Sequence, residues 1–476
     1  MRVAIVGSGP GGMITAKELT DAGIEITLFE RGSFCSQKDG PTPYGVDEMD
    51  VRYVDRGVTI AFGKPNVNYV EGCCLGGGSE VNAGLYQRTP EDVLRVWRNK
   101  FGLISAHNKE LDPHFEACEK LINVCNMPFS PPIASEKIRL GASKLGWQCK
   151  EAPRWYKYLT KEDKGVYSGI RQSMTEAVLP RINVRKIDIR IETVVTKITE
   201  TNSGQVILHA KELGGLKEYD DSFDAVFISG GAIGTADLLK RSGIGVKHVG
   251  SNLRLHPSIR ATARFEEVVN GPSSGIPVHQ VKEFMPHFSI GGSISNLAYL
   301  SAGLSDNDVN PLELLGNWNH YSTYYAAVGE GVGRVSSLPT INRPFVRFDL
   351  GKKGLRVLAE GLRAMCELLF AAGAKEVFPS IRGYGSLKNE SDIGLLPKSL
   401  DPRNVALMTI HLMGSCAMGS HDEACVDIDG RLRGYRNIYV ADASIIPTAL
   451  GVNPQGTIMA FTRMNAITFC REALDG

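Results

Sequence analysis

Two polar residues near the carboxyl end of this 476-residue chain are suited to the chemistry of alcohols. His411 opens a run ending at Gly419, and Asn453 lies within Gly451-Val452-Asn453-Pro454. An imidazole near its ordinary pKa can take a hydroxyl proton as a general base. A carboxamide can donate a hydrogen bond to the oxygen as alkoxide charge develops. The pair therefore predicts a site that grips an alcohol oxygen and removes its proton.

The first residues predict a nucleotide site at the other end of the chain. Residues 2–6 are typical of a buried strand, 7–12 form a glycine-rich turn, and 13–19 have helical periodicity that ends at Gly23. A second strand, 24–29, ends at Glu30. Glycines allow backbone to approach a pyrophosphate closely, and the amides of a helix N-terminus attract phosphate. Glu30 can accept hydrogen bonds from ribose hydroxyls, so the unit predicts a bound dinucleotide.

Further segments of the chain also predict strands, glycine-rich turns and a helix. Residues 72–84 are rich in glycine and end Val-Asn-Ala-Gly, and residues 225–234 form a strand that enters a glycine turn. Residues 194–198 predict another strand, and Ile438–Val440 predicts a buried strand that leads to Asp442. A helical pattern then runs from Thr457 to Met464.

The order of these segments resembles the glucose-methanol-choline (GMC) family of flavin-dependent alcohol oxidoreductases. In its His/Asn pair the chain is nearer to cholesterol oxidase, pyranose oxidase and gluconate-dehydrogenase-like members than to the His/His glucose oxidases. The resemblance covers the first 90 residues, about 180–260, and 400 to the end. It implies FAD as cofactor, His411 as the base, and Asn453 as the amide donor. His256 falls in the family's "G-x-N-L-x-x-H-P" turn, which implies a structural role.

The residues and the resemblance together assign a set of cofactor contacts. They are Gly7, Gly9, Pro10, Gly11, Gly12, Glu30, Arg31, Gly77, Gly78, Ser79, Asn82, Ala83, Gly84, Val195, Gly230, Asp442, Ala443, Gln455, Gly456 and Thr457. Some relatives attach FAD covalently through a histidine near the first signature. No histidine occurs between Met1 and Lys100, so we expect non-covalent FAD.

The expected fold is α/β, or α+β overall. A Rossmann-like FAD-binding domain comprises 1–90, 165–258 and 400–476. A discontinuous substrate domain, 91–164 and 259–399, is built on an antiparallel sheet. Within it, 317–325 alternates polar and aromatic residues like a half-buried strand, 355–372 predicts a core helix, and 271–275 is a candidate lid or rim of the site.

Composition excludes several other classes of protein. The net charge of +1 and the absence of long like-charged blocks argue against a nucleic-acid partner. No stretch approaches the roughly 18 apolar residues of a membrane span, and the strand at residues 2–6 leaves no room for a leader, so we expect a cytoplasmic protein. The ten cysteines lack metal-site spacing, and no metal is expected.

Several alternatives concern substrate and reaction. The first interpretation is oxidation of a polyol, sugar or amino-sugar hydroxyl, including a role in aminoglycoside antibiotic biosynthesis, with oxygen or another electron acceptor. A sterol or other apolar alcohol is the second. A non-redox lyase on the same flavin fold is a third, and an NAD-dependent dehydrogenase or a binding protein is less favoured.

Overall fold

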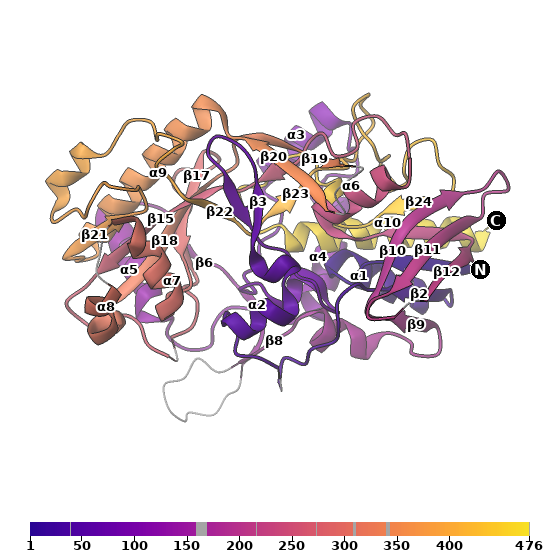
Figure 1. The fold of residues 1–476 in the computed structure, drawn as a ribbon, viewed down its shortest axis with the longest axis horizontal. Coiled ribbons are helices and arrows are strands. Elements are labelled where there is room, and N and C mark those ends of the chain that lie inside the picture. The colour runs from indigo at the N-terminus through magenta and orange to yellow at the C-terminus, as the bar shows by residue number, and fades with distance from the viewer. Residues whose placement is uncertain are drawn as a thin grey trace.

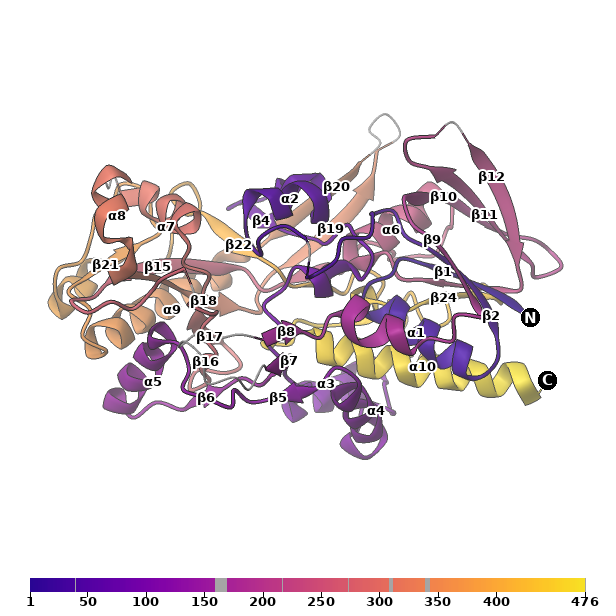
Figure 2. The same ribbon diagram turned by 90° about the horizontal axis from the view of Figure 1, so that it is seen from below.

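A five-stranded parallel sheet forms one half of the molecule in the computed structural model. Its order is β24 (Ile438–Val440), β13 (Ala225–Ile228), β1 (Arg2–Val6), β2 (Glu25–Phe29) and β9 (Ile187–Arg190). Strands buried on both faces need nearly continuous apolar sequence, and residues 3–6 and 26–29 are all buried. Helix α1 (Pro10–Asp21) connects β1 to β2 and packs on α10 (Gln455–Asp475). The order of strand, glycine turn, helix and strand expected for residues 2–30 is confirmed (Figures 1 and 2).

Two smaller elements complete this half. Helix α6 (Gly231–Arg241) follows β13, and β10 (Thr193–Glu200), β11 (Val206–Glu212) and β12 (Glu218–Phe223) form an antiparallel sheet. Figure 1 places this sheet, both termini and the long α10 at the same end of the molecule.

A nine-stranded sheet forms the other half. Its strands follow the order β3 (Thr59–Ala61), β4 (Val67–Tyr69), β22 (Leu407–Thr409), β15 (Ser258–Arg264), β18 (Tyr321–Val328), β17 (Phe288–Gly292), β16 (His279–Val281) and β6 (Cys149–Glu151), and β21 (Glu376–Pro379) also pairs with β15. All pairings are antiparallel except that of β22 with β4. Residues 59–69 and 407–409 therefore join this sheet, although they fall in ranges assigned to the cofactor domain.

Helices α5 (Ile133–Leu145) and α9 (Gly351–Ala371) pack together beside the nine-stranded sheet (Figure 2). Gly361 of α9 lies so close that an added Cβ would be 3.1 Å from Ala326 Cβ. In the sheet register Ala326 is opposite Ile259 and Ile290, so these apolar side chains share the face that α9 covers. The opposite face of the sheet carries Ser258 and Tyr325, and it is the face that borders the functional site.

The remaining helices and strands lie outside these sheets. The helices are α2 (Val46–Arg52), α3 (Glu91–Phe101), α4 (Asn108–Leu121), α7 (Leu297–Leu304) and α8 (Pro311–Asn317). The paired strands are β14 (Arg254–Leu255) with β23 (Leu412–Met413), β19 (Val332–Ser337) with β20 (Pro344–Asp349), and β7 (Arg154–Tyr158) with both β5 (Val124–Cys125) and β8 (Gly169–Arg171).

Two predicted boundaries differ from the structure. The strand expected from residue 317 begins only at Tyr321, because Trp318–His320 forms a short 3₁₀ turn. The core helix begins at Gly351, where the amide of Gly351 donates to Asp349 Oδ1 (2.9 Å), and it ends at Ala371, two residues before Gly373.

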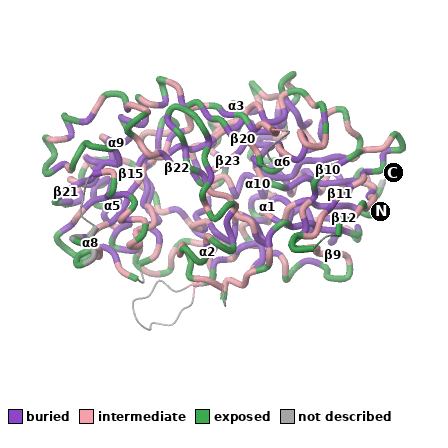
Figure 3. The backbone as a smooth tube through the Cα atoms, in the orientation of Figure 1, coloured by how far each residue is buried: buried purple, intermediate pink, exposed green. Residues whose placement is uncertain are grey.

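The structure describes residues 1–38, 40–158, 169–215, 217–272, 274–307, 311–338 and 343–475. The predicted boundary between 164 and 165, and Ser273 of the candidate lid, lie outside these ranges. Burial follows the sheets in both halves, and exposed residues gather at the periphery (Figure 3). No helix within the described ranges has the length and apolar character needed to cross a bilayer.

Candidate functional site

A cavity of about 1970 Å³ lies between the two halves of the molecule. Small-molecule sites typically occupy about 300–1,000 Å³, so this cavity has room for a dinucleotide and a second molecule. Most of the predicted contacts lie on its wall. These are Gly7, Gly9, Pro10, Gly11, Glu30, Arg31, Gly77, Gly78, Asn82, Ala83, Gly84, Val195, Gly230, Asp442, Ala443, Gln455, His411 and Asn453. Segments far apart in sequence thus meet at one site.

Four predicted contacts lie behind the wall instead. An added Cβ at Gly12 would sit 2.0 Å from the carbonyl oxygen of Gly7, so Gly12 permits helix packing. Ser79 Oγ donates to the carbonyl of Gly76, at 2.8 Å. Thr457 Oγ1 is 2.8 Å from Thr89 Oγ1, and Gly456 packs on Tyr86.

The turn between β1 and α1 is shaped to admit a bound group. Gly7 has φ of +103°, which favours glycine, and an added Cβ at Gly11 would sit 1.9 Å from the carbonyl oxygen of Ala441. Gly9 differs, since its φ is −63° and nothing lies within 4 Å of an added Cβ. An added Cβ at Gly77 would be 2.8 Å from Gly9 Cα, so the two glycine segments touch. The open space at Gly9, beside the amides that begin α1, fits a pyrophosphate.

Two buried carboxylates fix the turn between β1 and α1 and the turn between β13 and α6. Glu30 Oε2 accepts from the amide of Ser8 (3.0 Å) and from Ser8 Oγ (2.5 Å), and Glu30 Oε1 accepts from the amide of Gly32 (2.7 Å). Asp442 accepts from Thr235 Oγ1 (2.5 Å) and from the amide of Gly231 (2.8 Å), which joins the end of β24 to the start of α6. Burial raises the pKa of both carboxyls, and these hydrogen bonds oppose it.

His411 and His256 are in direct contact. In the β14–β23 pair Leu255 is opposite Leu412, which brings the next residues, His256 and His411, face to face. Their Nδ1 atoms are 2.9 Å apart and their rings are nearly perpendicular, at 88°. Asn453 Nδ2 is 3.3 Å from His411 Nε2, so the predicted pair is brought together, with His256 as a third member.

The hydrogen bonds assign the tautomers of both rings. His256 Nε2 accepts from the amides of Leu450 (3.1 Å) and Gly451 (3.0 Å), so the proton of neutral His256 is on Nδ1. That proton is donated to His411 Nδ1, and neutral His411 therefore carries its own proton on Nε2. His411 Nε2 and Asn453 Nδ2 are then both donors, so the 3.3 Å between them is an approach of two donors that can meet one oxygen, not a hydrogen bond between the two side chains. Burial lowers the pKa of both rings, to about 4 for His411, where the charge of Lys282 adds to the effect. Both rings are accordingly neutral at pH 7.

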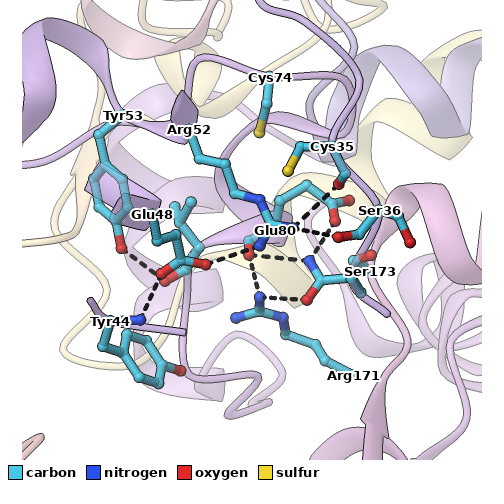
Figure 4. Close-up of polar contacts among 12 residues, drawn as sticks. Cys35, Ser36, Tyr44, Glu48, Arg52, Tyr53, Cys74, Glu80, Arg171 and Ser173 are labelled. Carbon is cyan, nitrogen blue, oxygen red and sulfur yellow. Dashed lines mark hydrogen bonds and ion pairs between the residues drawn. The ribbon is translucent and has the colours of Figure 1, made fainter. Parts of the chain in front are cut away.

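Side chains that sequence reasoning missed support the segment 72–84 from behind (Figure 4). Arg171 donates to the carbonyl oxygens of Glu80 and Asn82, and its Nη2 donates to Gln37 Oε1 (3.0 Å). Asn82 Nδ2 in turn donates to Gln455 Oε1 (2.9 Å) at the start of α10. Arg171 has no local sequence signal, because the strand that carries it lies about 90 residues away in sequence from the loop it holds.

A buried ion pair anchors the same region. Arg52 Nη1 is 2.8 Å from Glu48 Oε1, and both side chains are at most 1% exposed. Arg52 also donates to the carbonyls of Cys35 (3.1 Å) and Ser36 (2.8 Å). The pair thus fixes α2 to the chain that precedes the second glycine segment.

We expect Arg52→Met to lower the free energy of unfolding by about 3–5 kcal/mol, because it leaves the Glu48 carboxylate buried without its partner. Chemical denaturation measures the change. Arg56→Met is the matched control, since the pair of Arg56 and Asp50 is 77% and 55% exposed and should contribute less than about 1 kcal/mol. Equal effects of the two substitutions would contradict this account.

Comparison with known proteins agrees with this geometry. Models of the GMC oxidoreductase family match residues 31–258 and 333–462, and a model of an FAD binding domain matches 1–38. An uncharacterised GMC-type oxidoreductase of Sinorhizobium fredii is 36% identical over 465 residues, which cover 96% of this chain and 92% of that protein. The chain belongs to the GMC oxidoreductase family. A long-chain-alcohol oxidase of Arabidopsis thaliana is 26% identical over 96% of this chain and 66% of its own.

Solved structures share the GMC fold. Pyridoxine 4-oxidase from Mesorbium loti superposes with a TM-score of 0.73 at 17% identity, covering 100% of this chain and 99% of its own. A formate oxidase gives a TM-score of 0.74 at 16% identity, covering 99% and 98%. The expected mixed α/β fold with an FAD-binding unit is confirmed. This GMC oxidoreductase is an FAD-dependent enzyme that acts on CH–OH groups.

Proposed function

We propose that the chain oxidises a hydroxyl group of a small polyol or sugar, with His411 and Asn453 holding the reacting oxygen. The observation that carries this proposal is the approach of His411 Nε2 to Asn453 Nδ2, 3.3 Å apart on the wall of the cavity. FAD, when bound, supplies the acceptor for the hydride that leaves the CH–OH carbon. The residues of the chain bind the alcohol, orient it and manage its hydroxyl proton.

The tautomers define how His411 handles that proton. With its proton on Nε2, His411 first meets the substrate oxygen as a hydrogen-bond donor. To act as the base, it must free Nε2 by holding its proton on Nδ1, which requires His256 to move its own proton to Nε2. His256 would then face two backbone amides without accepting from them, at a cost of about 1–3 kcal/mol for each buried group left unsatisfied. The tautomer of His411 that can act as the base is therefore the less populated one, and substrate binding must shift the tautomer equilibrium toward it.

The cofactor contacts support FAD, and the lack of a histidine between Met1 and Lys100 supports non-covalent attachment. The open space at Gly9 and the amides that begin α1 fit its pyrophosphate, and the wall residues of 72–84 and 442–455 fit the rest of its length. We propose, as expected from the sequence, that the half built on the parallel sheet holds the cofactor and that the nine-stranded sheet forms the substrate side.

We expect flavin reduction that depends on neutral His411 to stay level between about pH 8 and 5 and to fall as the pH drops through about 4. The direction follows from the pKa of His411, which burial lowers from 6.5 to about 4, so the neutral form persists well below pH 6.5. The unfolded chain binds this proton near pH 6.5, so the contribution of His411 to stability is lost between pH 6.5 and 4. Rapid-mixing reduction rates across this range give the profile, and half-loss near pH 6.5 would refute it.

The substrate class has one serious alternative. The Arabidopsis thaliana relatives are named long-chain-alcohol oxidases. They are 23–26% identical to this chain over 65–66% of their own length, and their name favours an apolar alcohol. The amino-sugar substrate, the aminoglycoside pathway, the choice between oxygen and another acceptor, the cytoplasmic location and the absence of a nucleic-acid partner stay predictions.

An anaerobic panel of alcohols tests the proposal. Polyols, sugars and long-chain alcohols are mixed with FAD-loaded protein, the loss of flavin absorbance is followed, and air is then admitted with an assay for peroxide. We expect polyols or sugars to bleach the flavin fastest. Faster bleaching by long-chain alcohols would move the assignment to the alternative, and conversion of an alcohol without bleaching would indicate a lyase.

A further inference from the structure

Arg260 projects from the nine-stranded sheet into the cavity without a partner. It lies on β15, and its side chain lines the wall together with Ser258, two residues earlier on the same face of the strand. Its Nε is fully buried and makes no hydrogen bond. Within the described ranges the guanidinium has no hydrogen bond, ion pair or stacked ring. The other wall arginines have partners: Arg241 pairs with Asp237 (2.7 Å) and Arg343 with Asp55 (3.2 Å), and Arg31 interacts with Cys73 and with the carboxylate of Glu71.

No acidic side chain balances the charge of Arg260 on its part of the described cavity wall. Between residues 256 and 327, and between 408 and 412, Arg260 is the single charged side chain on the described part of the cavity wall, while the acidic wall residues belong to other segments of the chain. Asp306 acts on Arg260 electrostatically but forms no ion pair with it. Burial lowers the pKa of Arg260 in spite of Asp306, which indicates a cation without sufficient counter-charge.

Neighbouring positions on the sheet leave room beside the guanidinium. Arg260 is opposite Tyr325 in the register, and Tyr325 is opposite Gly291. An added Cβ at Gly291 would lie 2.6 Å from Tyr325 Oη, so glycine allows the tyrosine to lie across the sheet. The Tyr325 ring thus leans toward β17 and away from Arg260, while Tyr299 on the same cavity wall acts on the guanidinium electrostatically.

We propose that Arg260 binds an anionic group of the alcohol substrate, a carboxylate or a phosphate. A partly buried cation is costly when unpaired, whereas a guanidinium presents a planar fork of donors that suits these two anions. His256 beside His411, then Ser258 and Arg260, follow one another along the same segment. Since a strand rises about 3.3 Å per residue, the anionic group would lie several bonds from the oxidised hydroxyl.

This inference rests on the proposed function and narrows it. An amino sugar would bring an ammonium group beside an unpaired guanidinium, so like charges would oppose its binding. A long-chain alcohol without a charged end would leave Arg260 unpaired. Hydroxy acids and phosphorylated polyols remain as the substrate classes that offer a hydroxyl group to His411 and Asn453 and an anionic group to Arg260.

Binding of non-oxidisable anions tests the inference without turnover. FAD-loaded protein is titrated with hexanoate, hexyl phosphate and the uncharged hexanamide, and the change in flavin absorbance gives each Kd. We expect one of the two anions to bind at least about tenfold more tightly than the amide, because a hydrogen bond to a charged group is stronger than one between neutral groups. The two anions distinguish a carboxylate from a phosphate. Equal Kd values for the anions and the amide would overturn the proposal.

Two variants attribute that preference to Arg260. Arg260→Gln should abolish it, raising the Kd of the preferred anion about 10- to 100-fold while leaving the amide unchanged. Arg264→Gln is the matched control, because Arg264 lies on the same face of β15 but pairs with Glu376 (3.3 Å). An unchanged preference in Arg260→Gln would overturn the proposal, and the wild-type comparison decides the matter if that variant does not fold. Anion binding without reduction by any alcohol would instead refute the proposed function alone.

Discussion

His411→Ala should retain its yellow colour and lose about 10²- to 10⁴-fold of the rate at which an alcohol reduces the flavin. A positioned group that handles a proton in the transition state contributes about this much, or roughly 2.7–5.4 kcal/mol. The cofactor should stay bound, because the glycine turn and the carboxylates that fix it lie on other segments. Anaerobic rapid mixing of each FAD-loaded variant with excess alcohol measures the rate.

Two further variants define what the imidazole does. His287→Ala removes an exposed imidazole outside the cavity wall and should reduce flavin at the wild-type rate. His411→Gln keeps a donor but provides no base, so a rate between those of wild type and His411→Ala would show that donation to the oxygen accounts for part of the effect. A His411→Ala variant as fast as wild type would show that another residue is the base.

Gly9→Val should give a folded protein that purifies without colour. Its φ of −63° suits any residue and nothing lies within 4 Å of an added Cβ, so the free protein has no reason to unfold. The new side chain would fill the space beside the first turn of α1 where the pyrophosphate is expected. We expect FAD affinity to fall at least about 10²-fold, or about 2.8 kcal/mol, as measured by titration of the apoprotein with FAD.

Two other glycines separate loss of the cofactor from loss of the fold. Gly394→Val, at an exposed position away from the cavity, should bind FAD normally. Gly11→Val should fail to fold, because its Cβ would lie 1.9 Å from the carbonyl oxygen of Ala441. If Gly9→Val keeps wild-type affinity for FAD, the cofactor does not pass over this turn.

The parts of the fold that could be predicted are those that depend on local pattern. The strands at 2–6 and 24–29 have nearly continuous apolar sequence, and a glycine turn with an acidic residue after the second strand is a local signal. Asn453 and His411 were predicted through their motifs, and the structure brings them within 3.3 Å. The nine-stranded sheet was expected only in outline, because it is assembled from strands as distant as 59–61 and 407–409, and no local signal reports such pairing.

Residues that act through distant partners could not be predicted. His256 was assigned a structural role from its turn, yet its contact with His411 depends on the pairing of β14 with β23. Arg171 and Arg52 have no motif, and their roles appear only once the fold places them behind the second glycine segment. Arg260 resembles any arginine on an alternating strand until the absence of a partner on the described cavity wall sets it apart.

The most direct test of the account uses an alcohol that carries deuterium on the carbon to be oxidised. Anaerobic reduction of the FAD-loaded wild-type protein is compared for the labelled and unlabelled alcohols by the loss of flavin absorbance. The account predicts bleaching by both and a slower rate with deuterium, because the hydrogen on that carbon is transferred as hydride. Absence of bleaching by any alcohol, or consumption of the alcohol while the flavin stays oxidised, would contradict it.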